Sequence, residues 1–464
     1  MLGVSQVSPN KGSQKNYLSV NSLNTVVVQR PYVSAQAFQQ ADSVHFGSTA
    51  NTKQIPDVLI KNRKEDFITP SPHQYYHQWL WDAAFHAIVL SHYDVDMAKK
   101  EMNTLLKAQW PNGFVPHIQM DPKVVKEYHP NAQDWATGRN TSGVTQTPMI
   151  AAAIREIYQQ AGDKEYLKQT LPKVLKYHQW LKSDREIQQD GLVAIIHPWE
   201  PGSDNSPIFD SLRNKLWEQH YRDVKLPFTR VDTKHVDPSQ RPSDKDYQVY
   251  WGLVEAFQKT GWDQAKMAET SPFAVADPMF NAAWAQANQD LAYLYEQIDD
   301  PKTADTLKSW AEQTKKAMND QMWSEEASVY YAKDLRSGEK IPVKTSNGLL
   351  PLYAGVPNQH QAKKLVATMM DPDAFKGHYG IRGVDKSEPG YDPKNYWRGP
   401  SWINIHWFLV NGLKRYGFDK EAAEVTKKAK DLVAKEGYRE YYHPDTGTGL
   451  GAKDFAWSSL VHIL

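Results

Sequence analysis

From about residue 75 onward, apolar residues recur every three to four positions in one segment after another, with polar loops between some of them. This is the period of an amphipathic helix, whose buried face returns every 3.6 residues. Residues 1 to about 55 lack this period and are rich in Ser, Asn, Gln and Val. The pattern therefore predicts an all-α domain over residues 56–464, preceded by a polar N-terminal arm over residues 1–55.

The predicted helices come in pairs that differ in polarity. The first helix of a pair is apolar or aromatic, as in the segments WLWDAAFHAIVL, TPMIAAAIREIY and SWINIHWFLVNGL. The second follows a Gly, Asp or Pro turn and carries one charged face, after the junctions SHYDVDMAKKEM, QQAGDKEYLKQT, EQIDDPKTADTL, YAGVPNQHQAKK and KRYGFDKEAAEV. Each pair is thus expected to place an inner helix in the core and an outer helix over it.

The number of pairs indicates a closed ring. With DYQVYWGLVEAF and the terminal KDFAWSSLVHIL included, there are about a dozen helices, as an (α/α)6 barrel of six inner and six outer helices requires. An α-solenoid is the alternative. Long connections, roughly residues 110–143, 186–245, 321–345 and 372–398, recur after the outer helices. If they share one end of the ring, they form a deep pocket there, which favours the barrel.

The composition excludes several classes of protein. The 464 residues include no Cys and are 40% hydrophobic, so the chain can bury a large core without disulfides. Basic and acidic residues are equal in number and interspersed, which gives no reason to expect a nucleic-acid partner. No signal-peptide pattern and no apolar run of about eighteen residues is present. We therefore expect no membrane association and a cytoplasmic location.

Aromatic residues are frequent, with 16 Trp and 24 Tyr. Sugars bind by stacking their C–H faces on flat aromatic rings, although core filling explains many single Trp residues equally well. The loop of residues 197–207, HPWEPGSDNSP, combines a Trp with two carboxylates. Cleavage of a glycosidic bond needs a carboxylic acid held protonated near the leaving oxygen, and burial beside an indole raises a carboxyl pKa. Asp204 fits this role and Glu200 less well; helix capping and binding of loop amides are the alternatives.

A second carboxylate is required, and Glu440 in REYYHPDTG precedes two aromatic residues. A solvated helix end is the alternative for this segment. The clusters YYHQWLWD and YWRGPSW add aromatic and charged residues that could grip a sugar, or could be core. Asp82 and Arg398 within them would be costly to bury unpaired.

Other chemistries find little support. The segment GTGLGA follows no predicted strand, so it does not match a dinucleotide site. His73 and His77 stand four apart but lack a third ligand nearby for zinc. We predict no metal and no organic cofactor.

Several motifs, in order, resemble glycoside hydrolase family 63, and within it the bacterial and plant mannosylglycerate and glucosylglycerate hydrolases. They are YHQWLWDAAFHA, GFVPH, TQTP, WEPGSDNSP, RVDTKHVDPSQRPSDKDY, DPMFNAAWAQAN, YWRGPSWI and EYYHPDTGTGLGAKDFAW, from about residue 70 to the end. The resemblance implies Asp204 as general acid and Glu440 as general base, which coincide with the candidates above. The N-terminal arm matches nothing in the family, and Thr147 stands where its members commonly have Pro.

The resemblance also implies the substrate-binding residues. A sugar subsite would be formed by Trp81, Asp82, Gln146, Trp199, Gly202, Trp397 and Trp402. Tyr75, His117 and Tyr396 would lie nearer the aglycone. His117 and Arg398 could contact a substrate carboxylate or sugar hydroxyls, or could only make loop-stabilising hydrogen bonds.

We therefore expect an inverting α-glycosidase acting on a small α-mannoside or α-glucoside, with mannosylglycerate or glucosylglycerate favoured. Single displacement predicts carboxyl groups roughly 6.5 to 9.5 Å apart. One alternative is an α-glucosidase of the same fold that cleaves di- or oligosaccharides in an open cleft; another is a sugar epimerase or a sugar-binding barrel. The expected partner is a small sugar; a homo-oligomer is left open. Residues 230–247 are a candidate lid, with a merely solvated loop as the alternative.

Overall fold

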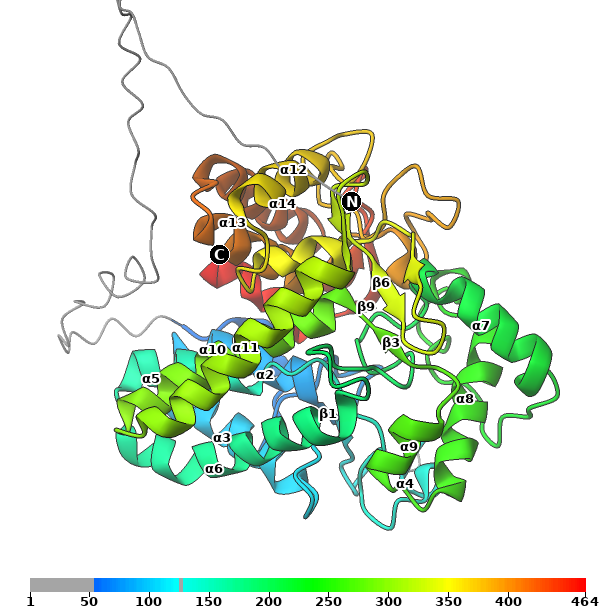
Figure 1. The fold of residues 1–464 in the computed structure, drawn as a ribbon, viewed down its shortest axis with the longest axis horizontal. Helices are drawn as coiled ribbons and strands as arrows, with labels where there is room; N and C mark the ends of the chain where they lie inside the picture. The colour runs from blue at the N-terminus through cyan, green and yellow to red at the C-terminus, as the bar shows by residue number, and fades with distance from the viewer. Residues whose placement is uncertain (1–53, 125–127) are drawn as a thin grey trace, which may run out of the picture. The chain divides into compact units, whose positions relative to one another are not determined.

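The computed structural model describes residues 54–124 and 128–464. The chain divides into two units, Met1–Thr52 and Lys53–Leu464. Apart from residues 54 and 55, the predicted N-terminal arm lies outside the described residues, so the arm stays a prediction. The second unit is rich in helices (Figure 1). None of the described helices is long and apolar enough to cross a lipid bilayer.

Ten helices of more than ten residues form the body of this unit: α2 (Leu80–Ser91), α3 (Val95–Leu105), α5 (Ile150–Ala161), α6 (Lys164–Trp180), α8 (Asp244–Lys259), α10 (Pro278–Gln297), α11 (Pro301–Gln321), α12 (Gln359–Met369), α13 (Ile403–Arg415) and α14 (Asp419–Glu436). Shorter α-helices are α1 (Asp57–Lys61), α4 (Ala132–Trp135), α7 (Asp210–Leu216) and α9 (Gln264–Thr270). The 3₁₀ segments are η2 (Leu106–Ala108), η4 (Pro207–Phe209), η6 (Pro238–Gln240), η7 (Ser346–Leu352), η8 (Tyr396–Arg398) and η9 (Ala456–Ile463), and η3 (Leu181–Arg185) and η5 (Trp217–Tyr221) are π-helical.

The pairing of apolar and charged helices is confirmed. Every residue of α2 is buried, whereas α3 buries one face. The Asp residues of the predicted turns begin the outer helices: Asp94 accepts a hydrogen bond from a backbone amide in the first turn of α3, and Asp163 and Asp300 do the same in α6 and α11. A capping carboxylate satisfies an amide that has no partner within the helix, and it opposes the positive end of the helix dipole.

The apolar elements contact one another in a closed order: α2, α5, α10, η7, α13, η9 and α2 again. The charged helices pack outside them, with α3 on α2, α11 on α10 and α14 on α13; Figure 1 shows α10 and α11 side by side. Two predicted ring members differ. DYQVYWGLVEAF became α8, which packs mainly on α7 and η5, and the terminal KDFAWSSLVHIL is 3₁₀ rather than α-helical. The position in the inner ring that was expected for α8 is occupied by η7. Gly348 and Pro351 interrupt the helical period of η7, so the sequence pattern did not predict it.

Short strands interrupt the predicted all-α pattern. The described residues include four small antiparallel sheets. They pair β1 (Gln78–Trp79) with β2 (Ile118–Gln119), β3 (Val275–Ala276) with β6 (Ala332–Asp334) and β6 with β7 (Lys340–Ile341), β4 (Trp323–Ser324) with β5 (Val329–Tyr330), and β8 (Arg439–Tyr442) with β9 (Gly449–Lys453). Strands of two to five residues are too short to show a two-residue period, so the sequence pattern could not reveal them.

Aromatic side chains pack together in the core of the ring, so removing one of them should lower the stability of the fold. Phe85 on α2 is fully buried, and its ring lies 5.7 Å from those of Trp81 and Phe408. We expect Phe85→Ala to lower the free energy of unfolding by about 3 to 5 kcal/mol, because the cavity loses both burial and packing. Ile60, which is 47% exposed, is the control, and Ile60→Ala should cost less than about 0.5 kcal/mol. Denaturant titration followed by Trp fluorescence measures both; equal losses would contradict this account of the core.

Candidate active site

A pocket with a volume of about 850 Å³, open solvent at its mouth included, collects side chains from three of the four predicted long connections. The exception is residues 321–345, which form β4 to β7 and contribute none of the lining residues. Aromatic rings make up much of the wall: Tyr75, Trp79, Trp81, Tyr128, Trp135, Trp199, Tyr247, Tyr396, Phe455 and Trp457. Charged groups in the lining are Asp82, Asp204, Asp232, Arg241 and Glu440.

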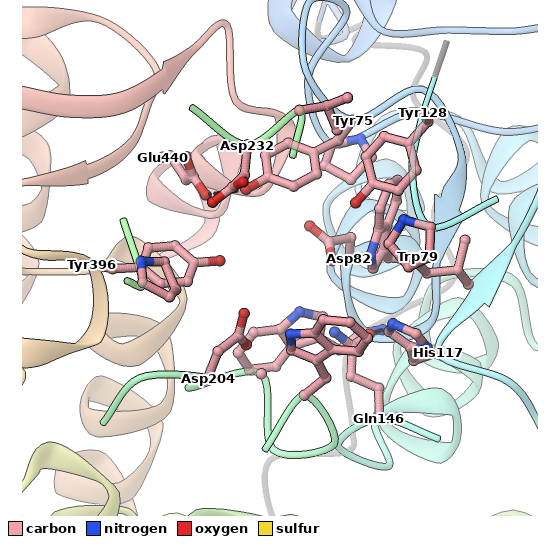
Figure 2. A pocket seen from close by; sticks show the side chains of 18 of the residues that line it. Tyr75, Trp79, Asp82, His117, Tyr128, Gln146, Asp204, Asp232, Tyr396 and Glu440 are labelled. Atoms are coloured by element: carbon pink, nitrogen blue, oxygen red, sulfur yellow. Dashed lines mark hydrogen bonds between the residues drawn. The ribbon is translucent and has the colours of Figure 1, made fainter. Parts of the chain in front are cut away.

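The pocket brings together most of the predicted site residues. Those in its lining are Tyr75, Trp81, Asp82, His117, Gln146, Trp199, Gly202, Asp204, Tyr396 and Glu440. Figure 2 shows the carboxyl groups of Asp204 and Glu440 pointing into the pocket from different parts of its wall. Trp397, Arg398 and Trp402 are not among the lining residues.

Asp204 lies in a loop that is pressed against an indole. Gly202, two residues before it, has φ +79°, and a Cβ there would come within 2.4 Å of Cζ2 of Trp81. Only glycine therefore permits this approach of the loop to Trp81. Burial raises the pKa of Asp204 to about 8, because the charged form loses its hydration. Asp204 is thus a carboxylic acid that keeps its proton near neutral pH.

Glu200, the other carboxylate of this loop, is fully buried and faces away from the pocket lining. Arg185 donates from Nη1 to both of its carboxylate oxygens at 2.9 Å. The amides of Ile196 and Thr145 also donate to it, at 2.7 and 3.3 Å. The interpretation of Glu200 as a partner of loop amides is confirmed, and this ion pair holds the loop from behind.

Arg398 also stabilises the Asp204 loop rather than facing the pocket. Its guanidinium donates to both carboxylate oxygens of Asp210, at 2.8 and 2.7 Å, and to the carbonyl oxygen of Asn205 at 3.1 Å. The side chain of Asn205 in turn accepts from the amide of Trp397 at 3.0 Å. Of the two roles considered for Arg398, these hydrogen bonds fit the loop-stabilising one, and contact with substrate stays a prediction.

Trp397 and Trp402 form the wall behind Tyr396. Their rings stack with centroids 3.7 Å apart and planes 3° from parallel, and both residues are buried. Trp402 lies 4.5 Å from the ring of Tyr441 as well. One face of each indole is thus covered by the other, and neither residue is among those that line the pocket, so their place in a sugar subsite stays a prediction.

Glu440 lies on β8 and is 1% exposed. Arg241 binds both of its oxygens, with Nη1 at 3.1 Å from Oε1 and Nη2 at 2.7 Å from Oε2. The hydroxyl of Tyr75 donates to Oε1 at 2.8 Å, and the amide of Ala452 on β9 donates to Oε2 at 2.9 Å. The two carboxylate oxygens of Glu440 thus accept four hydrogen bonds.

The other predicted residues complete one side of the pocket. Asp82, in the first turn of α2, is buried, and this burial raises its pKa well above the usual range, with the charge of Glu440 adding to the effect. Gln146 accepts a hydrogen bond from the amide of Trp81 at 3.0 Å. His117 is hydrogen-bonded through Nδ1 to Ser142, and burial lowers its pKa to about 3, so the imidazole is neutral.

Arg241 and Asp232 were missed by the sequence analysis. Both lie in the candidate lid, and together with Tyr247 they form part of the pocket wall. Asp232 is paired with Arg230 at 2.7 Å. The charge of this segment was visible, but nothing in the sequence indicated which of its charges would face a carboxylate 199 residues away. Among the described residues, no group of three His, Cys, Asp or Glu side chains is arranged to hold a metal ion.

The raised pKa of Asp204 predicts a pH-dependent contribution to stability. In the unfolded chain this carboxyl ionises near pH 4, whereas in the folded protein it holds its proton until about pH 8. Its contribution to the free energy of unfolding therefore falls as pH rises from about 4 to about 8. Asn cannot ionise, so Asp204→Asn should gain stability relative to the wild type between pH 5 and pH 9. Denaturant unfolding at both pH values tests this; a constant difference between the two proteins would contradict it.

Comparison with known proteins places this geometry in a family. Residues 75–458 match the model of the mannosylglycerate hydrolase MGH1-like glycoside hydrolase domain. A mannosylglycerate hydrolase of Thermus thermophilus is 37% identical over 417 residues, which are 88% of this chain and 98% of that protein. A glucosylglycerate hydrolase of Mycolicibacterium hassiacum is 30% identical over 444 residues, 87% of this chain and 94% of that protein.

A solved structure agrees with these sequence matches. It is the crystal structure of a GH63 mannosylglycerate hydrolase from Thermus thermophilus in complex with Tris and D-glycerate, which matches with a TM-score of 0.82 at 36% identity and covers 88% of this chain and 98% of that one. Because the family model and these relatives span most of the chain, the protein belongs to the MGH1-like glycoside hydrolases of family 63.

Proposed function

We propose that this glycoside hydrolase cleaves mannosylglycerate or glucosylglycerate with inversion at the anomeric carbon. The observation that carries the proposal is the pocket itself, which combines a protonated carboxyl group with a second carboxyl group that is paired with a guanidinium. The names of the relatives support the two substrates. Sugar release from each conjugate distinguishes mannose from glucose as the sugar that the pocket binds.

We propose the (α/α)6 barrel as the scaffold of this site. The closed order of contacts from α2 through η9 supplies six inner elements. Six helices outside them complete the double ring: α1, α3, α6, α11, α12 and α14. In this arrangement the pocket lies where the loops before α2, between α3 and α5, after α6 and before α13 meet, together with the β8–β9 hairpin.

Asp204 is the proposed general acid. Departure of the aglycone leaves negative charge on the glycosidic oxygen, and a carboxyl group with a pKa near 8 still carries the proton that this oxygen needs at pH 7. The ion pair of Arg185 with Glu200 and the contacts of Arg398 hold the loop on which Asp204 stands. A fixed proton donor reduces the entropy lost in reaching the transition state.

Glu440 is the proposed general base. In single displacement it accepts a proton from a water molecule while the oxygen of that water bonds to the anomeric carbon from the face opposite the leaving group. The inverting assignment predicts room for the water, with carboxyl groups roughly 6.5 to 9.5 Å apart. Water supplies both the hydroxyl group of the released sugar and the proton that Glu440 takes up.

The sugar and the aglycone are proposed to occupy different parts of the pocket. Trp81 and Trp199 offer aromatic surface to the sugar ring. Asp82 is suited to sugar hydroxyls, because its Oδ1 is buried without a partner within the described residues. Arg241 is the guanidinium in the lining, so it is the group suited to the carboxylate of a glycerate aglycone.

The epimerase alternative fits the pocket less well. Proton abstraction by histidine needs an imidazole with a pKa near the working pH. Burial lowers the pKa of both His117 and His197 to about 3, so both imidazoles are neutral at pH 7 and are weak bases. His197 is further held by the carbonyl oxygen of Tyr250 and the amide of Trp199.

The substrate assignment is tested by sugar release from mannosylglycerate, glucosylglycerate, trehalose and nigerose. We expect rapid release from one of the two glycerate conjugates. Asp204→Asn and Glu440→Gln should each lower kcat by at least about a hundredfold, the usual contribution of a general acid or base. The exposed Glu436 on α14 is the control, and Glu436→Gln should leave the rate unchanged. Release from trehalose or nigerose alone would reject the proposed substrates, and full activity of either site variant would reject its role.

The pKa of Asp204 sets the alkaline limit of activity. A general acid works only while protonated, so kcat/KM for the glycerate conjugate should fall as pH rises through about 8. A glycosyl fluoride of the same sugar leaves as fluoride without being protonated, and its hydrolysis should lack this limb. Rate profiles between pH 5 and pH 10 with both substrates provide the measurement. An alkaline limb near pH 5, or the same limb with both substrates, would contradict the assignment.

A further inference from the structure

The Glu440 carboxylate has no acceptor position left for a water molecule in this structure. An ionised carboxylate offers about four lone-pair positions, two on each oxygen. Oε1 accepts from Tyr75 and from Nη1 of Arg241, and Oε2 accepts from Nη2 of Arg241 and from the amide of Ala452. A base in this state cannot also accept the hydrogen of an attacking water, so at least one donor must turn away before the reaction.

Two of the three donor residues are held by other contacts. The amide of Ala452 belongs to β9, whose pairing with β8 fixes it beside Glu440. The ring of Tyr75 is packed edge-on against Trp79 at 5.3 Å and against Phe455 at 5.7 Å. Movement of Tyr75 would disturb the wall of the pocket, and movement of Ala452 would disturb the β8–β9 hairpin.

Arg241 is the donor that can exchange its partner. It follows the short η6 segment, and its buried Nε has no hydrogen-bond partner within the described residues. Its guanidinium lies over the ring of Tyr396 at 4.7 Å, with the rings of Tyr75 and Tyr441 at 5.9 and 6.0 Å, so flat surfaces surround it along which it can shift. The guanidinium also faces the pocket, where a ligand can reach it.

We propose that Arg241 makes hydrolysis depend on an anionic aglycone, because a substrate carboxylate draws it away from Glu440 and so frees the base. This inference rests on the proposed function and adds a control on the same site. Exchange of one carboxylate for another keeps the guanidinium paired, so it costs little. With a neutral aglycone, Arg241 could leave Glu440 only by losing its buried counter-ion, which is strongly unfavourable. Neutral glycosides then fit the sugar subsite but leave the base occupied.

A glycosyl fluoride isolates this step. In its hydrolysis the water oxygen bonds to the anomeric carbon, the C–F bond breaks, fluoride leaves with the electron pair, and Glu440 takes the proton of the water. The substrate has no aglycone carboxylate and needs no proton from Asp204. Its rate therefore reports the availability of Glu440.

The experiment measures fluoride release by the wild-type protein from α-mannosyl fluoride and α-glucosyl fluoride, with and without D-glycerate. We expect saturating D-glycerate to raise the rate by about tenfold or more, since release of one hydrogen bond to a charged group changes a barrier by that amount. Glycerol, which lacks the carboxylate, is the matched control and should not accelerate the reaction. A lower rate, or no change, with D-glycerate would overturn the proposal, because a ligand that only fills the pocket slows or ignores the fluoride.

The Arg241→Gln variant provides a second readout. It should release fluoride without D-glycerate at least as fast as the wild type does with it, and should no longer respond to the anion, while cleavage of the glycerate conjugate falls. Arg336→Gln, at an exposed arginine outside the pocket lining, should respond like the wild type. A variant that still responds to D-glycerate would contradict the role of Arg241.

Failure of the proposed function gives a different result. If neither glycerate conjugate is cleaved but small carboxylates accelerate fluoride release, the substrate assignment fails and the control by Arg241 stands. If a conjugate is cleaved and fluoride release ignores the anion, the substrate assignment stands and the control by Arg241 fails.

Discussion

Carboxyl groups that leave bulk water must either keep a proton or find a cation, and this constraint organises the whole pocket. Asp204 and Asp82 take the first course, since burial raises the pKa of both. Glu440 and Glu200 take the second, each bound through both carboxylate oxygens to an arginine, although burial also raises the pKa of Glu200. The aromatic wall of the pocket thus carries both an acid and a base.

Ion pairs also hold the loop that carries Asp204 in place. Arg185 holds the loop from the core through Glu200, and Arg398 holds it from the opposite segment through Asn205. Gly202 lets the backbone pass against Trp81 on the sugar side. Several motifs that are far apart in the sequence therefore act on the position of a single carboxyl group, which explains why aromatic and charged residues recur together in each of them.

The helical period and the turn residues were sufficient to predict the paired helices, because burial of one face and capping by Asp are local effects. The same period could not predict η7, where Gly348 and Pro351 interrupt the pattern, or the hairpin that carries Glu440. Most of the residues that local motifs identified line the pocket. Trp397, Arg398 and Trp402 lie outside this lining, because a motif shows which residues cluster but not which face of the cluster meets the cavity.

Arg241 shows the limit of sequence reasoning most clearly. Its partner Glu440 lies on a hairpin near the end of the chain, and only folding brings the two segments together. The cytoplasmic location, the absence of a nucleic-acid partner and the state of oligomerisation stay predictions for a related reason, since each concerns surroundings that the folded chain does not contain.

The stereochemistry of the released sugar tests the central claim, a single displacement between Asp204 and Glu440, most directly. Proton NMR can follow hydrolysis of the α-linked glycerate conjugate before the product mutarotates. Single displacement predicts that the β-anomer of the free sugar appears first and then equilibrates. First appearance of the α-anomer would contradict the account, because it would require a second displacement at the anomeric carbon.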